Sequence, residues 1–240
     1  MEFTYDAYAN LVSELREHKY QFASYHDYKC FEKCVIMRHD IDYSLEKAVK
    51  LAEFEKQLDM KSTYFILVSS PFYNVISADS LSQIKVIQNA GHEIGLHFDE
   101  LNYTEDQYRK FGGVERAIRK ELELLSSVLD SEIRSVSMHR PSKKTLEANY
   151  DFGDVVNSYG KEFFDGFKYV SDSRRRWRED VNEVIQSDKY PQLHILTHAF
   201  WYNTVERDIK ESILAFIDEA KEERLVSLDQ NITDLSEIID

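Results

Sequence analysis

Two aspartates that directly follow a short apolar run are the first residues in this chain whose types and spacing suggest chemistry. The run 35–37 is typical of a buried strand, and Asp40 and Asp42 come just after it. Residues two apart in an extended chain point to the same side, so both carboxylates should face one site. Buried charges are costly unless they are paired or bind metal. We therefore expect one aspartate to hold a cation and the other to act as a base; a solvated turn before a helix near Ser44 is the alternative.

Three of the eight histidines fall at the predicted carboxyl ends of strands. They are His97, His139 and His198. Aspartate and imidazole are ordinary ligands for zinc and related cations. Such a cation polarises a carbonyl and makes its bound water more acidic, a free carboxylate takes the proton, and a histidine donates one to the leaving group. These residue types therefore favour metal-assisted hydrolysis over a merely structural role.

The elements that would position these residues alternate between strand and helix. This pattern predicts an α/β fold with a parallel sheet and right-handed crossovers. We expect a single domain over 1–240, a distorted (β/α)7-type barrel with an N-terminal helical extension, 1–30, packed on it. An open doubly wound parallel sheet is the alternative, and either architecture places a site at the carboxyl ends of the strands. The expected strands cover residues 35–37, 63–68, 92–97, 133–138, 155–156, 167–170 and 193–197.

The composition narrows the classes of partner. The 240 residues carry a formal net charge of −14, which argues against nucleic acid as a partner. Two cysteines, Cys30 and Cys34, are too few for a disulfide framework, and we expect both to be reduced. The N-terminus does not have the pattern of a signal peptide, and no apolar run approaches the roughly 20 residues of a membrane span. We expect a cytoplasmic protein without a transmembrane segment, and its oligomeric state stays open.

The motifs between residues 35 and 198 resemble those of the polysaccharide deacetylase, or NodB-homology, superfamily of carbohydrate esterases (family 4-like). The pair in Asp40-Ile41-Asp42 is similar to the family's first motif, which implies Asp40 as the base and Asp42 as a metal ligand. The segment 91–97 is very similar to Gly-His-Glu-Ile-Gly-Asn-His, whose last histidine is a ligand and corresponds to His97. By the same resemblance, Arg140 in His139-Arg140-Pro141 would orient the base, and His198 in Leu196-Thr197-His198 would be the catalytic acid.

One departure from the family pattern concerns the third metal ligand. The family's second motif carries another histidine four residues after the first, but this chain has Leu101 there. His139, Asp99 or Asn102 could supply the missing ligand, and we favour His139 because it ends the adjacent strand. The expected cofactor is a divalent metal, Zn²⁺ first, with Co²⁺, Mn²⁺ or Ni²⁺ as alternatives. A metal held by fewer protein groups, or no metal at all, is the other possibility.

The candidates for substrate binding are four residues in the last third of the chain. Asp172 and Trp177 loosely match the family's fourth motif. Arg176 belongs to the basic run 174–178, which could grip a phosphate, diphosphate or carboxylate or could be a solvated loop. Trp201 could stack on a sugar or pack in the core.

Together these features predict a metal-dependent hydrolase that removes an N-acyl group, acetyl or formyl, from an amino sugar. By analogy with the family, a nucleotide- or lipid-linked intermediate of surface-polysaccharide biosynthesis is the expected substrate. One alternative is a hydrolase of a non-sugar amide such as a cyclic imide or ureide. The other is a catalytically inactive glycan-binding protein, which the leucine at position 101 motivates.

Overall fold

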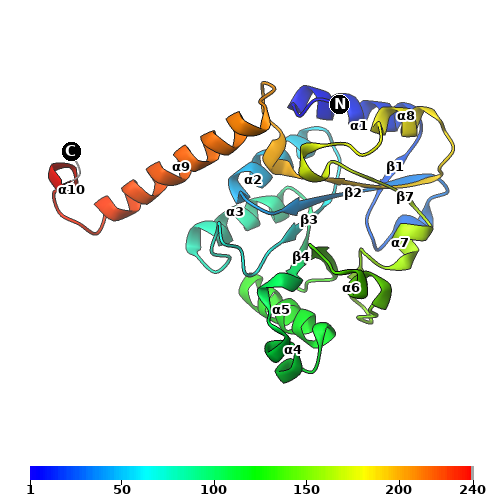
Figure 1. The fold of residues 1–240 in the computed structure, drawn as a ribbon. Coiled ribbons are helices and arrows are strands. Elements are labelled where there is room, and N and C mark those ends of the chain that lie inside the picture. Colours follow the sequence, from blue (N-terminus) through cyan, green and yellow to red (C-terminus); the bar gives the residue numbers. More distant parts are fainter. Residues whose placement is uncertain (239–240) are drawn as a thin grey trace.

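The computed structural model describes residues 1–238 as a parallel sheet surrounded by helices (Figure 1). The strands are β1 (Gln21–Ala23), β2 (Cys34–Ile41), β3 (Thr63–Ile66), β4 (Glu93–Asp99), β5 (Ser135–His139), β6 (Val156–Asn157), β7 (Lys168–Ser171) and β8 (Gln192–Thr197). The helices are α1 (Tyr5–Glu17), α2 (Leu45–Gln57), α3 (Ala78–Asn89), α4 (Glu105–Phe111), α5 (Val114–Leu129), α6 (Lys143–Ala148), α7 (Lys161–Asp165), α8 (Val181–Gln186), α9 (Ile209–Asp229) and α10 (Leu235–Ile238).

The order of the strands identifies the sheet as an interrupted barrel. The strands follow one another as β6-β5-β4-β3-β2-β8-β7, and every pair is parallel. Because β8 returns to pair with β2, this is the cyclic order of a closed β/α barrel, interrupted between the consecutive strands β6 and β7. The predicted distorted barrel is therefore confirmed, and the open doubly wound sheet is not the architecture of this chain.

The side chain of Arg38 shows how strongly the sheet curls. Arg38 lies on β2, yet its guanidinium donates to Ser137 Oγ on β5 at 2.7 Å and to Ser158 Oγ, just after β6, at 2.9 Å. Neighbouring strands lie about 4.8 Å apart, so in a flat sheet β2 and β5 would be about 14 Å apart. The two strands can share one guanidinium only because the sheet bends round and encloses it.

Alternation along β2 separates the two faces of this curled sheet. Val35, Met37 and Ile41 pack in the larger apolar core, which includes residues of α1 and α2. Ile36, two residues before Arg38, belongs to a smaller cluster inside the curl. Because side chains alternate across a strand, Arg38, Asp40 and Asp42 continue the inner face towards its open end. The strand thus buries its outer face against helices while it carries the charged groups inward.

Local signals explain where several helices begin. Ser44 Oγ accepts a hydrogen bond from Lys47 N at 3.2 Å, so α2 begins where a capping serine was expected. Thr104 and Gln107 form a capping box that starts α4. Asp208 and Glu211 form another capping box, so the last long helix begins at Ile209.

The N-terminal extension contains a strand that sequence patterns missed. None of the expected strands covers the segment 20–28, but Gln21–Ala23 pairs with β2 through Cys34–Ile36. On β2, this pairing precedes the pairing with β3, which begins at Arg38. A run of three residues is too short to show a periodic pattern. The strand forms because this part of the edge of β2 is free to pair with it.

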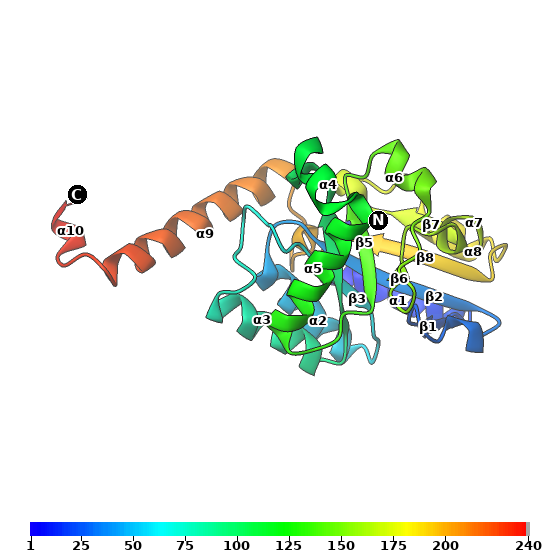
Figure 2. The same ribbon diagram turned by 90° about the horizontal axis from the view of Figure 1, so that it is seen from below.

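Helix α9 leaves the body of the molecule, and Figure 2 shows the same departure after a quarter turn. Near its start, Phe216 packs its ring against Phe200 and Phe72, at centroid distances of 5.3 Å and 5.6 Å. Among residues 1–238, no helix combines the length and the apolar composition that a bilayer crossing requires.

Candidate metal centre and hydrolytic cleft

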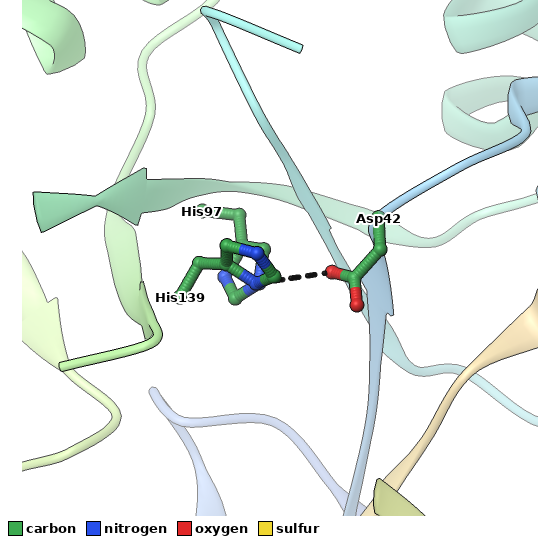
Figure 3. Close-up of side chains that lie close together, drawn as sticks. All are labelled: Asp42, His97 and His139. Atoms are coloured by element: carbon green, nitrogen blue, oxygen red, sulfur yellow. Dashed lines mark hydrogen bonds and ion pairs between the residues drawn. The ribbon is translucent and has the colours of Figure 1, made fainter. Parts of the chain in front are cut away.

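Three potential metal ligands converge at the carboxyl ends of β2, β4 and β5. His97 Nε2 and His139 Nδ1 each lie 3.3 Å from Asp42 Oδ1, and the two ring nitrogens are 3.1 Å apart. Figure 3 shows both rings directed towards the Asp42 carboxylate. Asp42 directly follows β2, whereas the histidines come from strands two and three positions away in the sheet. One point in space thus collects groups that are up to 97 residues apart in the chain.

The donor set fits a divalent cation. Zinc bonds nitrogen and oxygen at about 2.0–2.1 Å, so the donors of a tetrahedral site are separated by about 3.3–3.4 Å, close to the separations seen here. Asp42 Oδ1 is buried and makes no well-aligned hydrogen bond within residues 1–238; its neighbours there are the two imidazoles, which can themselves bind a cation. Burial acts to raise the pKa of Asp42, but His139 and His97 outweigh it and hold the pKa far below its usual range. The carboxylate is therefore ionised and available as a ligand.

Of the three residues that could replace the missing second-motif ligand, His139 is the one that lies with Asp42 and His97. Asp99, one of the other candidates, is buried and forms an ion pair with Arg140. Asn102 donates to Ser69 O at 3.4 Å, and Leu101 is 65% exposed. Of the three candidates, His139 alone joins Asp42 and His97 as a possible metal-binding group in the described part of the chain.

Asp40 lies beside this centre and is held from below by Arg38. Arg38 Nη2 donates to Asp40 Oδ2 at 2.6 Å, and both side chains are almost completely buried. Burial acts to raise the pKa of Asp40, but Arg38, with smaller contributions from His97 and His198, lowers the pKa below its ordinary value. Asp40 Oδ2 is 3.7 Å from His97 Nε2, so an ionised carboxylate stands next to the candidate ligands.

His198 faces the same centre from β8 and is oriented by Asp172. Its Nδ1 lies 2.5 Å from Asp172 Oδ1, and its backbone N–H donates to Asp172 Oδ2 at 3.1 Å. Its other ring nitrogen, Nε2, is 3.8 Å from Asp42 Oδ2. Burial alone would lower the pKa of His198, but Asp172, helped by Asp42 and Asp40, raises it to about 9. The imidazole is therefore in its cationic form at neutral pH, with Nε2 directed towards the centre.

A cleft of about 650 Å³ opens above these groups. This volume suits a small ligand such as one or two sugar rings. Tyr43, Phe72 and Trp201 contribute aromatic surface to its wall, and Arg174 and Arg178 contribute charge. The remaining polar residues of the cleft lining include the predicted base, acid and ligands, namely Asp40, Asp42, His97, His139 and His198.

The other predicted site residues lie at varying distances from this cleft. Trp201 and Arg140 line it, although the arginine that contacts Asp40 is Arg38, and Arg140 pairs with Asp99 instead. Asp172 is fully buried beneath the cleft and contacts His198. Arg176 is exposed, and Trp177 is half-buried against the larger apolar core; neither belongs to the lining residues.

Reasoning from the sequence assigned no role to two residues of the centre, Arg38 and Ser137. Arg38 precedes Asp40 by two positions, and Ser137 precedes His139 by two, so each shares a strand face with a predicted site residue. Ser137 Oγ lies 3.1 Å from His97 Nδ1 and accepts from Arg38, which links the candidate metal ligand to the candidate base. The two-residue alternation was the signal that could have found them.

Comparison with known proteins gives only distant similarities. No family model matches the sequence, and no curated protein matches it. A CE4 family pseudoenzyme from Bacillus anthracis superposes with a TM-score of 0.46 and 17% identity, over 80% of this chain and 62% of its own. A family 4 carbohydrate esterase from Bacillus anthracis gives 0.45 and 16%, over 90% and 86%. The chitin deacetylase of Colletotrichum lindemuthianum gives 0.41 and 14%, over 78% and 81%.

The first two of these structures are described as members of family 4 of the carbohydrate esterases, the family that the motifs of this chain resemble. The first of them is described as a pseudoenzyme. At TM-scores below 0.5 these likenesses carry no argument about activity.

Proposed function

We propose that this protein is a metal-dependent hydrolase that removes an N-acyl group, acetyl or formyl, from an amino sugar. The observation that carries the proposal is the convergence of Asp42, His97 and His139 on one point, with Asp40 and His198 beside it. A divalent cation, zinc first among the candidates, would be held by these three ligands. When bound, it would polarise the acyl carbonyl and make a water molecule more acidic.

The remaining residues have roles that follow from their contacts. Asp40, ionised and fixed by Arg38, would take the proton from the attacking water. His198, protonated and fixed by Asp172, would donate a proton to the leaving amine nitrogen. Trp201 would offer an apolar wall against the sugar, and the aromatic groups around it would exclude water. An amine is a poor leaving group, so a positioned acid is what such an amide cleavage requires.

The expected substrate remains a nucleotide- or lipid-linked amino sugar of surface-polysaccharide biosynthesis, and the expected location remains the cytoplasm. The choice of substrate rests on the resemblance of the motifs to the family. The cleft volume of about 650 Å³ is consistent with a small soluble sugar or the end of a larger one.

The test is acid release by protein loaded with zinc, cobalt or manganese, from N-acetyl and N-formyl amino sugars, free and nucleotide-linked. Asp40→Asn should keep the bound metal but lose turnover by about 10²–10⁴-fold, as expected for a general base. Asp154→Asn is the matched control, because Asp154 is exposed and lies before β6, at the opposite end of the sheet.

Other outcomes would point elsewhere. Turnover that Asp40→Asn leaves unchanged would remove Asp40 from the reaction. Release of acid only from cyclic imides or ureides would make this protein a non-sugar amidohydrolase. Binding of glycans without acid release from any substrate would favour the inactive glycan-binding protein.

A further inference from the structure

The acidic side chains of the cleft are all engaged, which leaves a surplus of positive charge there. Three carboxylates line the cleft: Asp40, Asp42 and Asp99. Asp40 is paired with Arg38, and Asp99 with Arg140. Asp42 faces two imidazoles as a candidate cation ligand. No carboxylate of the cleft is therefore left to pair a further cationic side chain.

Two arginines of the cleft are nevertheless unpaired. Arg174 and Arg178 line it, both are exposed, and neither has an ion pair or a side-chain hydrogen bond within residues 1–238. Arg175, between them, is paired with Glu206 and also donates to Arg207 O. The cleft therefore presents two exposed guanidinium groups that no carboxylate of its lining neutralises.

The backbone turn at Arg174 and Arg175 gives these two neighbouring arginines different surroundings. Arg174 and Arg175 both have left-handed backbone conformations, with φ of 61° and 56°. Such conformations are uncommon for residues other than glycine and are costly, so the surrounding contacts must hold them. The ion pair between Arg175 and Glu206 anchors this turn, and Arg174 lies in the cleft as a result.

We propose that Arg174 and Arg178 bind an anionic substituent, a phosphate or a carboxylate, on the amino-sugar part of the substrate. The inference rests on the proposed function and deepens it. Guanidinium groups match the geometry of both anions and bind them through charge-assisted hydrogen bonds. A neutral polysaccharide offers neither group, so the cleft would prefer a charged, small or tethered sugar over a neutral chain.

The position of the two arginines decides which part of the substrate carries the charge. Arg174 lies two residues after Asp172, which holds His198. His198 is the group that would protonate the leaving amine, so this segment borders the sugar rather than the acyl group. An anionic acyl group, such as a dicarboxylic acid amide, would lie on the other side of the reacting carbon and would gain nothing from these arginines.

The experiment compares kcat/KM for charged and neutral substrates at low ionic strength. N-acetylglucosamine 1-phosphate and 6-phosphate test for a phosphate, N-acetylmuramic acid tests for a carboxylate, and methyl N-acetylglucosaminide is the neutral reference. Each of Arg174→Ala and Arg178→Ala should lower the charged-to-neutral ratio by about tenfold, the low end for a charge-assisted hydrogen bond because both side chains are exposed. Salt should reduce the wild-type ratio.

Three further variants sharpen the comparison. Arg134→Ala is the matched control, because Arg134 is exposed and precedes β5, at the end of the sheet away from the cleft. Arg134→Ala should leave the ratio unchanged, whereas Arg174→Lys should restore part of it. A larger effect of Arg176→Ala than of Arg174→Ala would overturn the assignment, because Arg176 is not among the lining residues.

A charged-to-neutral ratio near one in wild type, or equal losses on both substrates in the variants, would overturn the proposal while leaving the hydrolase intact. If no N-acylated sugar releases acid, calorimetry of N-acetylglucosamine 1-phosphate with chelator-treated protein still tests it, because the phosphate then has no metal to bind. Binding that Arg174→Ala weakens about tenfold would support the anion site, and absence of binding to wild type would overturn it.

Discussion

Replacing Asp172 by asparagine should move the alkaline limit of activity to lower pH. His198 can donate a proton only in its protonated form, and Asp172 is the largest of the influences that raise its pKa to about 9. Asparagine keeps the shape of the side chain but removes the negative charge. Burial, which lowers the pKa of an imidazole, would then act with less opposition, so the pKa should fall to the ordinary value near 6.5 or below. A cation on Asp42 would cancel that carboxylate's contribution but not the contribution of Asp172.

The size of the effect follows from the two protonated fractions. At pH 8, a histidine with a pKa of about 9 is about 90% protonated, whereas one with a pKa of about 6.5 is about 3% protonated. Asp172→Asn should therefore lower turnover about 30-fold at pH 8. At pH 6 the two fractions are about 100% and 75%, so the loss should be less than twofold. The variant's defect should thus grow steeply between these two pH values.

The assay is the pH profile of kcat/KM from pH 5.5 to 9.5 on an N-acyl amino sugar that wild type cleaves, with metal content measured in parallel. An activated ester needs less proton donation to its leaving group, so on that substrate the profile should change less. Asp154→Asn serves again as the control. Equal loss at every pH, with metal content preserved, would refute the reasoning, because it would mean that Asp172 holds the fold or the ring position and not the proton.

Three further predictions concern the metal and the stability of the fold. Asp42→Asn should lower zinc content by elemental analysis while the protein stays folded, and wild-type content would remove Asp42 from the ligands. Burial raises the pKa of Glu121 to about 7, so its stability contribution is full below about pH 4.5 and falls as pH rises through 7. The free energy of unfolding of Glu121→Gln, measured in urea relative to wild type, should therefore be about 2 kcal/mol more favourable at pH 8 than at pH 5. A difference from wild type that does not change with pH would contradict this. Burial acts to raise the pKa of Glu55, but His39 outweighs it and the pKa falls to about 2. Glu55→Gln should therefore lower the free energy of unfolding by about 3 kcal/mol at pH 7 and by less near pH 3. An equal loss at both pH values would contradict this.

Local patterns in the sequence determined most of the elements and the types of the site residues. Alternating strands and helices predicted the parallel sheet, because strands buried on both faces appear as short apolar runs. The aspartates at 40 and 42 and the histidines at 97, 139 and 198 were identified because each follows or ends such a run. Boundaries and short elements were less accessible. β1 exists only through its pairing with β2, and α4 through a capping box in a segment without apolar periodicity.

Only the tertiary structure decided which of these residues meet and what each one does. In a flat sheet the carboxyl ends of β2 and β5 would be about 14 Å apart, whereas Asp42 and His139 approach to 3.3 Å because the sheet curls. Arg38, which shares a strand face with Asp40, holds that carboxylate, while Arg140 turns to Asp99. Sequence patterns report which face of a strand a residue occupies, because that depends on neighbours in the chain. Curvature depends on the packing of the whole sheet against its helices, and it alone sets the distances on which a metal centre and an acid–base pair depend.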